Sequence, residues 1–444
     1  MGNIKMLFNS TAGNITNFMA IQASSQSNEA LKLEHAKALD LYHSQGLSHL
    51  EQRLAKVFSE PDKFTTVTLN IIRKIINQQA QTYREPARRT LEGSEADQKL
   101  YQEICEGCSL DLVLKQCSRL VKLLKSILLK VVWVEDKLRL DVIGGNLIQD
   151  IQTYDSPYDL KSVLIIDYGQ TNRIEDIEYS FWDSEVYKRL NYRFQILDEF
   201  ENPYSGKLPF VGLFDSYNIT DSFFQPLDES LISQQMSIDE KLTDLLYIIR
   251  MQGFGVGWIR TETHGTAGSL QTDPGTLVEL KGKDSAIGFE SQQSELGEIL
   301  SSIDKLCKWA CVSQGLSAAS MSTDPTEQSG LSKIVDTREL SEMRIDDKEN
   351  FRMLERNIYS TMRTIWNTHS TKKISENALL SVDFADLKQT VSGKEQAQSD
   401  DLKIAQGVMS PVDVLMRENP DITDRETALA HLLKIKDELK ELTE

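Results

Sequence analysis

The sequence has no apolar run long enough to cross a membrane. Its most apolar stretch, Leu120–Val134, is interrupted by Lys122, Lys125 and Lys130. A membrane-spanning helix needs about 20 consecutive, mainly apolar residues. The N-terminus also lacks the basic start, apolar middle and small-residue cleavage site of a secretory signal, and Met6 stands where a myristoylation motif has Ser or Thr. We therefore expect a protein that is made in a cytosol and contacts no membrane.

Cysteine is scarce, and its spacing does not predict a metal site. There are five cysteines, an odd number. Cys105 and Cys108 form a C-x-x-C pair, but neither a second pair nor a suitably spaced histidine follows. Cys307 and Cys311 lie four residues apart on an apolar stripe, where a free cysteine behaves as a small hydrophobic residue. We expect no metal and no cofactor.

Motifs for catalysis and nucleotide binding are also absent. Gly206–Lys207 and Gly393–Lys394 lack the first glycine and the following hydroxyl of a phosphate-binding loop. Gly253–Gly257 has alternating glycines without the strand-to-helix context of a dinucleotide loop. The six histidines include no pair at i, i+4 spacing, and acidic pairs such as Asp346–Asp347 indicate the solvated face of a helix. We expect a protein that is not an enzyme; a hydrolase with a dispersed site is the alternative.

Basic residues are outnumbered, with 49 Lys and Arg against 67 Asp and Glu and a formal net charge of −18. Proteins that grip DNA neutralise its phosphates with Lys and Arg and usually present a basic face. The composition therefore predicts poor DNA binding on average, although it allows a protein past which DNA slides. A chain of 444 residues, 40% of them hydrophobic, is long enough for two to three domains.

The first half of the chain predicts an α+β domain. Residues 1–28 are rich in Ser, Asn, Gln and Gly, so we expect them to be flexible. Helical apolar spacing runs from about residue 29 to 76, and a second pair of helices runs from Ser94 to Leu128. From Leu129 the apolar period changes to two, which predicts a mostly antiparallel sheet. The predicted strands lie at Val131–Val142, Val163–Ile166, Ile177–Trp182 and Tyr192–Leu197.

The second half predicts two amphipathic helices that bracket a short β segment. The first begins after Asp228 and ends at Gly253, and the second begins after Ser294 and ends at Gly315. A polar loop then leads to a third helix, from Leu331 to about His369. A short strand near Leu379–Phe384 and charged helices from about Lys394 follow.

This order of segments resembles that of the tailed-bacteriophage portal protein (head-to-tail connector) family. The strings that are similar to the family are Asn70 with Arg73–Lys74, Tyr83–Pro86, Leu208–Val211, Asp228–Gly253, Val256–Ile259, Ser329–Ser332 and Ala405–Pro411. The likeness covers about residues 30–440. It rests on the order and the lengths of the elements, because portal proteins carry no catalytic signature.

The resemblance implies a helix-rich α+β portal fold that is assembled as a ring. Its parts would be a flexible N-terminus (1–28), an α+β wing (29–227), stem helix 1 (228–253), a small β clip (254–293), stem helix 2 (294–315), a tunnel loop (316–330), a long wing helix and strand (331–392) and crown helices (393–444).

The implied function is that of a viral structural protein. A ring of about twelve identical subunits would occupy one vertex of the capsid, as the channel for packaging and ejection of double-stranded DNA. It would dock the terminase large subunit and a head-completion adaptor, contact capsid and scaffold proteins, and reside in the virion after assembly in the host cytoplasm. The alternative is another phage head–tail structural or adaptor protein.

The resemblance also assigns candidate site residues. The tunnel loop would touch DNA without gripping it through Met321, Thr323, Asp324, Thr326 and Glu327. The stem would pack through Ile238, Leu242, Leu245, Ile249, Leu296, Ile299, Ile303, Leu306 and Ala310. We expect the two stem helices to bury these apolar faces only against copies of themselves around a hollow axis. We also expect Trp258, Trp309 and Trp366 to be packing residues. The simpler alternatives are an ordinary core for the stripe and a solvent-exposed linker for the loop.

Overall fold

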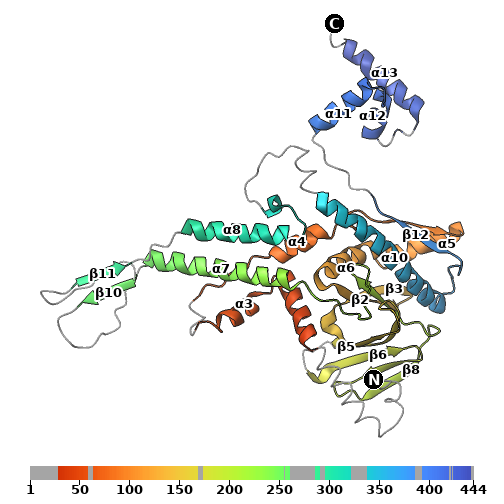
Figure 1. Cartoon of the computed structure of the whole chain (residues 1–444). Coiled ribbons are helices and arrows are strands. Elements are labelled where there is room, and N and C mark those ends of the chain that lie inside the picture. Colours follow the sequence, from red (N-terminus) through yellow and green to blue (C-terminus); the bar gives the residue numbers. More distant parts are fainter. Residues whose placement is uncertain are drawn as a thin grey trace. The chain divides into compact units, whose positions relative to one another are not determined.

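The chain divides into two compact units. The computed structural model describes residues 29–58, 64–168, 174–254, 256–260, 286–290, 296–321, 338–385, 393–419, 422 and 424–441. The first unit comprises Met1–Ser322 and Glu339–Ala385, and the second comprises Thr323–Arg338 and Asp386–Glu444 (Figure 1). The expectation of a flexible segment at 1–28 concerns residues outside the described part of the chain.

Short helices open the first unit, as the helical spacing predicted. They are a helix over residues 29–42, α3 (Leu47–Leu54) and α4 (Ile71–Gln79). The side chain of Asn70 caps α4 by accepting a hydrogen bond from the backbone N–H of Arg73. The next helix, α5 (Glu95–Gly107), is capped in the same way by Ser94, as predicted.

Helix α6 (Leu110–Leu124) ends four residues before the predicted boundary. Lys125 adopts a left-handed conformation with φ of 63°, and strand β2 (Ser126–Val134) begins at once. The residues Ile127, Leu128 and Leu129 are all fully buried. An apolar run that is buried on both faces carries neither a helical nor a strand period, so the sequence could not locate this junction.

Two antiparallel sheets follow, in agreement with the predicted sheet type. The three-stranded sheet has the order β3-β2-β9, with β3 at Lys137–Ile143 and β9 at Phe210–Phe214. The five-stranded sheet has the order β4-β5-β6-β7-β8. Its strands are β4 (Ile148–Thr153), β5 (Leu160–Tyr168), β6 (Ile177–Asp183), β7 (Val186–Leu190) and β8 (Ile196–Glu201).

The predicted strand at Tyr192–Leu197 is wrong over most of its length. Its first residues form the turn between β7 and β8, where the Asn191 side chain accepts hydrogen bonds from the backbone N–H groups of Arg193 and Gln195. An asparagine side chain that binds nearby backbone in this way competes with strand pairing.

A long helix contributes to the core of the first unit. Helix α10 (Arg338–His369) has 32 residues and carries a buried apolar stripe, namely Phe351, Leu354, Ile358, Met362 and Ile365. It is followed by β12 (Leu379–Asp383), which was predicted and which pairs antiparallel with β1 (Arg88–Glu92). Residues 331–337 of the predicted helix lie outside the described ranges.

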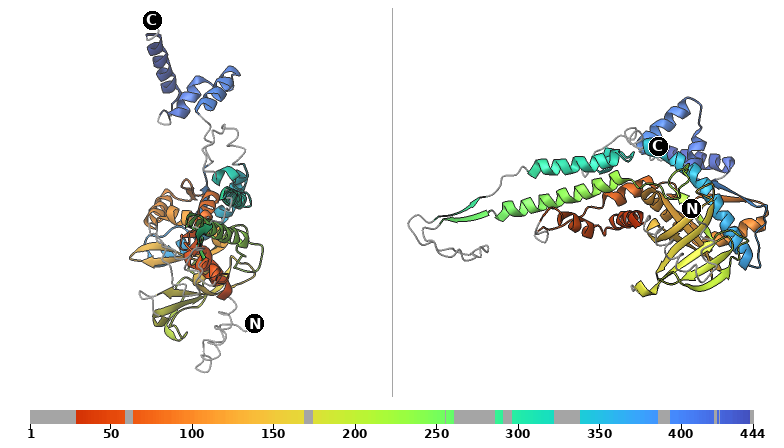
Figure 2. Two further views of the ribbon diagram at one scale, coloured as in Figure 1. Left: turned by 90° about the vertical axis from the view of Figure 1, so that its left-hand side faces the viewer. Right: turned by 60° about the horizontal axis from the view of Figure 1, so that its bottom comes forward.

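A helical hairpin extends from this unit beyond the sheets (Figures 1 and 2). It consists of α7 (Glu229–Phe254), β10 (Val256–Arg260), β11 (Ala286–Glu290) and α8 (Leu296–Val312). β10 and β11 pair antiparallel near the far ends of the two helices. The two helices contact each other, and α7 also contacts α3 and α4.

The described residues of the second unit form the helices α11 (Gly393–Ala405), α12 (Pro411–Glu418) and α13 (Arg425–Glu441). Ser410 and Asp413 form a reciprocal capping box at the start of α12. Arg417 pairs with Asp400 and thereby links α12 to α11.

Candidate functional site

The base of the hairpin is fixed by a chain of polar contacts. Asp228 caps α7 by accepting a hydrogen bond from the backbone N–H of Leu231 at 3.1 Å. Its second oxygen accepts a hydrogen bond from the Gln314 side chain at 2.6 Å, just beyond the end of α8. Gln79 of α4 in turn donates to the backbone carbonyl of Gln314 at 2.9 Å. The two helices therefore meet at a defined base.

A second set of contacts anchors α7 to the start of α4. Gln235 accepts a hydrogen bond from the backbone N–H of Ile71 at 3.0 Å, and Asp239 accepts one from that of Leu69 at 2.8 Å. Both side chains are buried. Burial raises the pKa of Asp239, and the hydrogen bonds from Leu69 and Gln235 oppose that shift. Sequence reasoning missed this anchor, because polar residues on a predicted helix give no sign of a distant backbone partner.

The predicted stem stripe is largely buried within a single chain. Ile238, Leu245, Ile303 and Ala310 are buried, and four further members are half-buried against the same core, namely Leu242, Leu296, Ile299 and Leu306. Ile249, towards the far end of α7, is 46% exposed. The expectation that these faces are buried only between copies is therefore wrong for the base of the hairpin, because α3, α4 and the facing helix cover them.

Helix α8 nevertheless keeps apolar side chains on its surface. Trp309 is 63% exposed and Val312 is 56% exposed, although Cys307, Ala310 and Cys311 beside them in the sequence are buried. At about 100° per residue, Trp309 and Val312 lie on the side of the helix opposite the buried stripe. Leu300, nearer the tip, is 60% exposed. The hairpin thus presents apolar groups on more than one face.

Three tryptophans were predicted to be packing residues, and the structure treats each of them differently. Trp366 packs on Trp133 with ring centroids 5.4 Å apart, as expected. Trp309 is 63% exposed among the described residues, so the part of a single chain that the structure describes does not bury it as a packing residue. The side chain of Trp258 lies outside the described part of the chain.

The predicted tunnel loop is described only at its start. Met321 ends a short 3-10 helix, η4 (Ala318–Met321), and packs partly buried against the core. Thr323, Asp324, Thr326 and Glu327 lie outside the described residues. The loop assignment stays a prediction.

The cysteines are free and buried or half-buried. Burial raises the pKa of Cys105 to about 12 and that of Cys108 to about 11. Thiols with raised pKa values are poor nucleophiles and poor metal ligands at neutral pH. Cys307 and Cys311 contribute to the buried face of α8, in accordance with the apolar role predicted for them.

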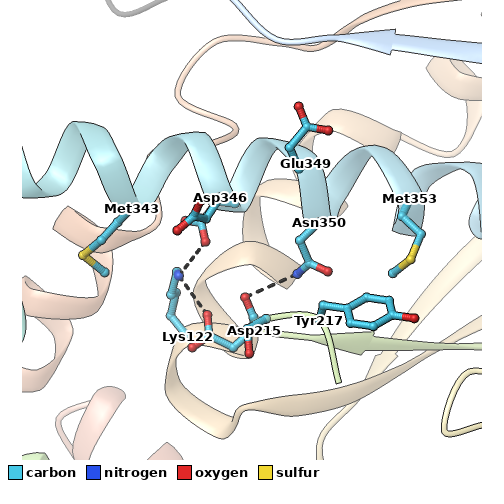
Figure 3. A pocket seen from close by; sticks show the side chains of 10 residues that line it. Lys122, Asp215, Tyr217, Met343, Asp346, Glu349, Asn350 and Met353 are labelled. Carbon is cyan, nitrogen blue, oxygen red and sulfur yellow. Dashed lines mark hydrogen bonds and ion pairs between the residues drawn. The ribbon is translucent and has the colours of Figure 1, made fainter. Parts of the chain in front are cut away.

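A cluster of charged side chains lies where α10 passes α6 and the end of β9 (Figure 3). The Lys122 ammonium is 2.8 Å from carboxylate oxygens of both Asp215 and Asp347. Lys125 is 2.8 Å from the other oxygen of Asp215. Burial would raise the pKa of Asp215, but the two lysines hold it below its ordinary value, whereas burial raises the pKa of Asp347 despite Lys122. The cluster borders a cavity of about 600 Å³.

The described part of the chain contains neither a membrane-spanning helix nor a metal site. No helix there combines the length and apolar composition needed to cross a bilayer. No group of three or more His, Cys, Asp or Glu side chains there has the arrangement of a metal site.

Among comparisons with known proteins, only the comparison with solved structures finds similar chains. No protein-family model and no curated protein matches the chain. The chain is similar to one in a solved structure described as the neck of an empty gene transfer agent particle computed with C6 symmetry, with a TM-score of 0.41 and 9% identity over 77% of this chain and 85% of that chain. It is also similar to a chain in the virion of a native gene transfer agent particle, with a TM-score of 0.37 and 10% identity over the same shares of the two chains.

Proposed function

We propose that this chain is a non-enzymatic ring subunit of a phage-like particle, of the portal type. The order of its elements supports the proposal: an α+β body, two helices that carry a small two-stranded sheet, a long helix through the body, and a separate helical unit. The short β10–β11 sheet would serve as the clip, and the unit that contains α11, α12 and α13 as the crown.

The observation that carries this proposal is the pair of apolar faces on α8. One face is buried within the chain, while Trp309 and Val312 on the opposite face are exposed. Single exposed apolar residues are ordinary on a protein surface, but a bulky pair on one face of a projecting hairpin is typical of an interaction site. A surface that contacts a different surface on the next copy produces a ring when the rotation closes. We therefore infer that hairpins of neighbouring subunits stand side by side.

The assembly state tests the proposal directly. Native mass spectrometry and negative-stain imaging of the full chain should give a closed ring of about twelve subunits with a central hole. Trp309→Ser with Val312→Ser should shift the population towards monomers, while Leu112→Ser, which removes an apolar side chain that is 71% exposed on α6, should not. A monomeric parent chain, or equal assembly in both variants, would contradict the proposal.

The channel and its partners form the finer part of the proposal. The acidic balance of the chain suits a wall past which duplex DNA slides, since the duplex carries one negative charge per about 1.7 Å of its axis. Basic walls would hold the phosphates at every step. Replacement of Asp324 and Glu327 by Lys should therefore slow DNA packaging in an assay that contains the terminase large subunit. Unchanged packaging would argue against a tunnel-loop role for these residues.

A second candidate is another head–tail structural protein, such as an adaptor ring that joins the head after packaging. It shares the assembled state, so ring imaging does not separate the two. Stable capture of the terminase large subunit by the assembled ring is expected for a portal. Capture of a head-completion protein without any binding of terminase would favour the adaptor.

A further inference from the structure

Strand β8 forms one edge of the five-stranded sheet, and no other described strand pairs with its outer side (Figure 1). The backbone N–H of Asn202 donates to the Glu185 carbonyl, and the register runs on from there without a shift as far as Asp198. Antiparallel strands alternate between residues that bond the partner strand and residues whose backbone groups face away from it. The backbone groups of Glu199 and Glu201 therefore face away from β7, at an edge that can accept a further strand.

Apolar side chains are exposed along this edge. Ile196, Leu197 and Phe200 are between 37% and 53% exposed. The Phe200 ring stacks on Tyr187 of β7 with centroids 6.0 Å apart, which fixes its position beside the edge. Free backbone groups next to exposed apolar side chains form a template for pairing with another strand. The edge thus offers both hydrogen bonds and apolar surface to an added segment.

The charge of the edge indicates which segment fits it. Asp198 pairs with Arg189 and Glu199 pairs with Lys188, each at 2.9 Å. Glu201 has no ion-pair partner among the described residues. A second copy of β8 would place like charges opposite one another, which disfavours pairing of two copies edge to edge. An apolar strand with a positive charge and no carboxylate suits this edge instead.

The N-terminal segment has that composition. Residues 1–28 contain no Asp, Glu or Arg, and Lys5 is their one Lys, although the chain as a whole has a formal net charge of −18. Within them, Ile4–Phe8 is a short apolar run between Gly2–Asn3 and Asn9–Ser10. Short apolar runs between turn-forming residues are typical of strands. These residues lie outside the described part of the chain, so their pairing is inferred from their sequence.

This segment can reach β8 of its own subunit. The helix over residues 29–42 begins beside β4, the opposite edge of the same sheet, where the side chain of Lys32 donates to that of Gln149. Neighbouring strands lie about 4.8 Å apart, so β4 and β8 are roughly 19 Å from each other. The 20 residues 9–28 span up to about 66 Å when extended. The link is therefore long enough to cross the sheet without help from a second copy.

We propose that Ile4–Phe8 adds to the free edge of β8 in the same subunit, as a sixth strand of this sheet. Its backbone bonds to the outward-facing groups of Glu199 and Glu201, and its apolar side chains cover those that the edge exposes. Lys5 brings a positive charge to the acidic strand. The inference does not depend on the ring, because the pairing lies within one subunit.

Hydrogen exchange of the full chain, followed by mass spectrometry of its peptides, tests the pairing. In the parent chain the amides of residues 4–8 should exchange at least tenfold more slowly than in an isolated peptide of the same sequence. Glu201→Pro removes an outward-facing donor and leaves the bonds to β7 in place, so it should abolish this protection. Met6→Pro should abolish it from the other strand and should also speed exchange at residue 199. The amides of β6 should stay protected in both variants, which would show that the sheet is intact.

Ser24→Pro is the matched control, because it places a proline in the N-terminal segment outside the proposed strand. It should leave the protection of residues 4–8 unchanged. Unprotected amides there in the parent chain, or an equal loss of protection in the control, would overturn the proposal. Protection that survives Glu201→Pro would do so as well, because the segment would then bind elsewhere. Protection that vanishes on dilution would show that the added strand comes from a second copy, against the proposal.

Discussion

Arg89 of β1 and Glu355 of α10 form a two-pronged ion pair in the core, although 266 positions separate them in the sequence. Arg89 Nε lies 2.6 Å from one carboxylate oxygen, and Nη2 lies 3.2 Å from the other. The side chain of Glu355 is 1% exposed, and Tyr83 donates to it at 2.7 Å. An ion pair between buried side chains therefore connects α10 to the β1–β12 pair.

Loss of one partner of this pair should be costly. Glu355→Gln leaves the Arg89 charge buried without its main counter-ion, and should lower the free energy of unfolding by about 3 to 5 kcal/mol. Urea titration monitored by tryptophan fluorescence would measure it, since all five tryptophans belong to the first unit. The control is Asp141→Asn, which breaks the exposed pair with Arg139 and should cost about 1 kcal/mol or less. Equal losses would refute a buried role for the Arg89–Glu355 pair.

Lys122→Met should destabilise the first unit in a pH-dependent way. At pH 7 the variant leaves the carboxylates of Asp215 and Asp347 close together and without their shared cation, at a cost of about 3 to 5 kcal/mol. Protonation of one carboxylate at lower pH relieves the repulsion, so the deficit relative to the parent chain should narrow from pH 7 to pH 5. Urea titrations of both proteins at several pH values check this, and a deficit that does not change with pH would contradict it.

His35 should make the fold acid-sensitive. The ring is fully buried with both nitrogens unpartnered among the described residues, and burial lowers its pKa from 6.5 to about 4. Above pH 6.5 the His35 ring is neutral in both the folded and the unfolded chain, so it does not make the free energy of unfolding depend on pH. Between pH 6.5 and pH 4 the unfolded chain binds a proton that the folded chain does not, so about 3 kcal/mol of stability is lost by pH 4.

Substitution of His35 measures how much this residue contributes to the loss of stability in acid. His35→Leu should flatten the fall in stability between pH 6.5 and pH 4 in urea titrations, whereas substitution of the exposed His43 by Gln should leave it as steep as in the parent chain. An unchanged slope in the His35 variant would show that other groups cause the acid sensitivity.

Gly145 should not tolerate a side chain. A Cβ atom at this position would lie 2.4 Å from His35 Nδ1, inside the core. Gly145→Ala should therefore cost about 1 to 3 kcal/mol, as overpacking does. Gly297→Ala is the matched substitution within α8, where a Cβ would meet nothing within 4 Å, so it should be neutral or stabilise the helix by up to about 1 kcal/mol. Melting temperatures of the two variants should move apart, and a stable Gly145 variant would count against the contact.

The sequence alone determined the elements whose signals are local. The caps Ser94 and Asp228, the two-residue period of the strands and the stripe on α8 each depend on neighbours within a few positions, and the structure has them where predicted. The junction at Lys125 and the turn after β7 could not be placed, because the first lies in an apolar run without a period and the second depends on a side chain that binds backbone.

Only the tertiary structure decided which partner each face meets. Periodicity shows that a face is apolar, but it does not show what covers the face, so the sequence could not separate the buried Ile303 from the exposed Leu300 on α8. The same holds for polar groups: Gln235, Asp239 and Asn350 gain their roles from backbone atoms between 135 and 170 positions away. Such contacts have no local signal, because they form only when the chain folds and brings distant segments together.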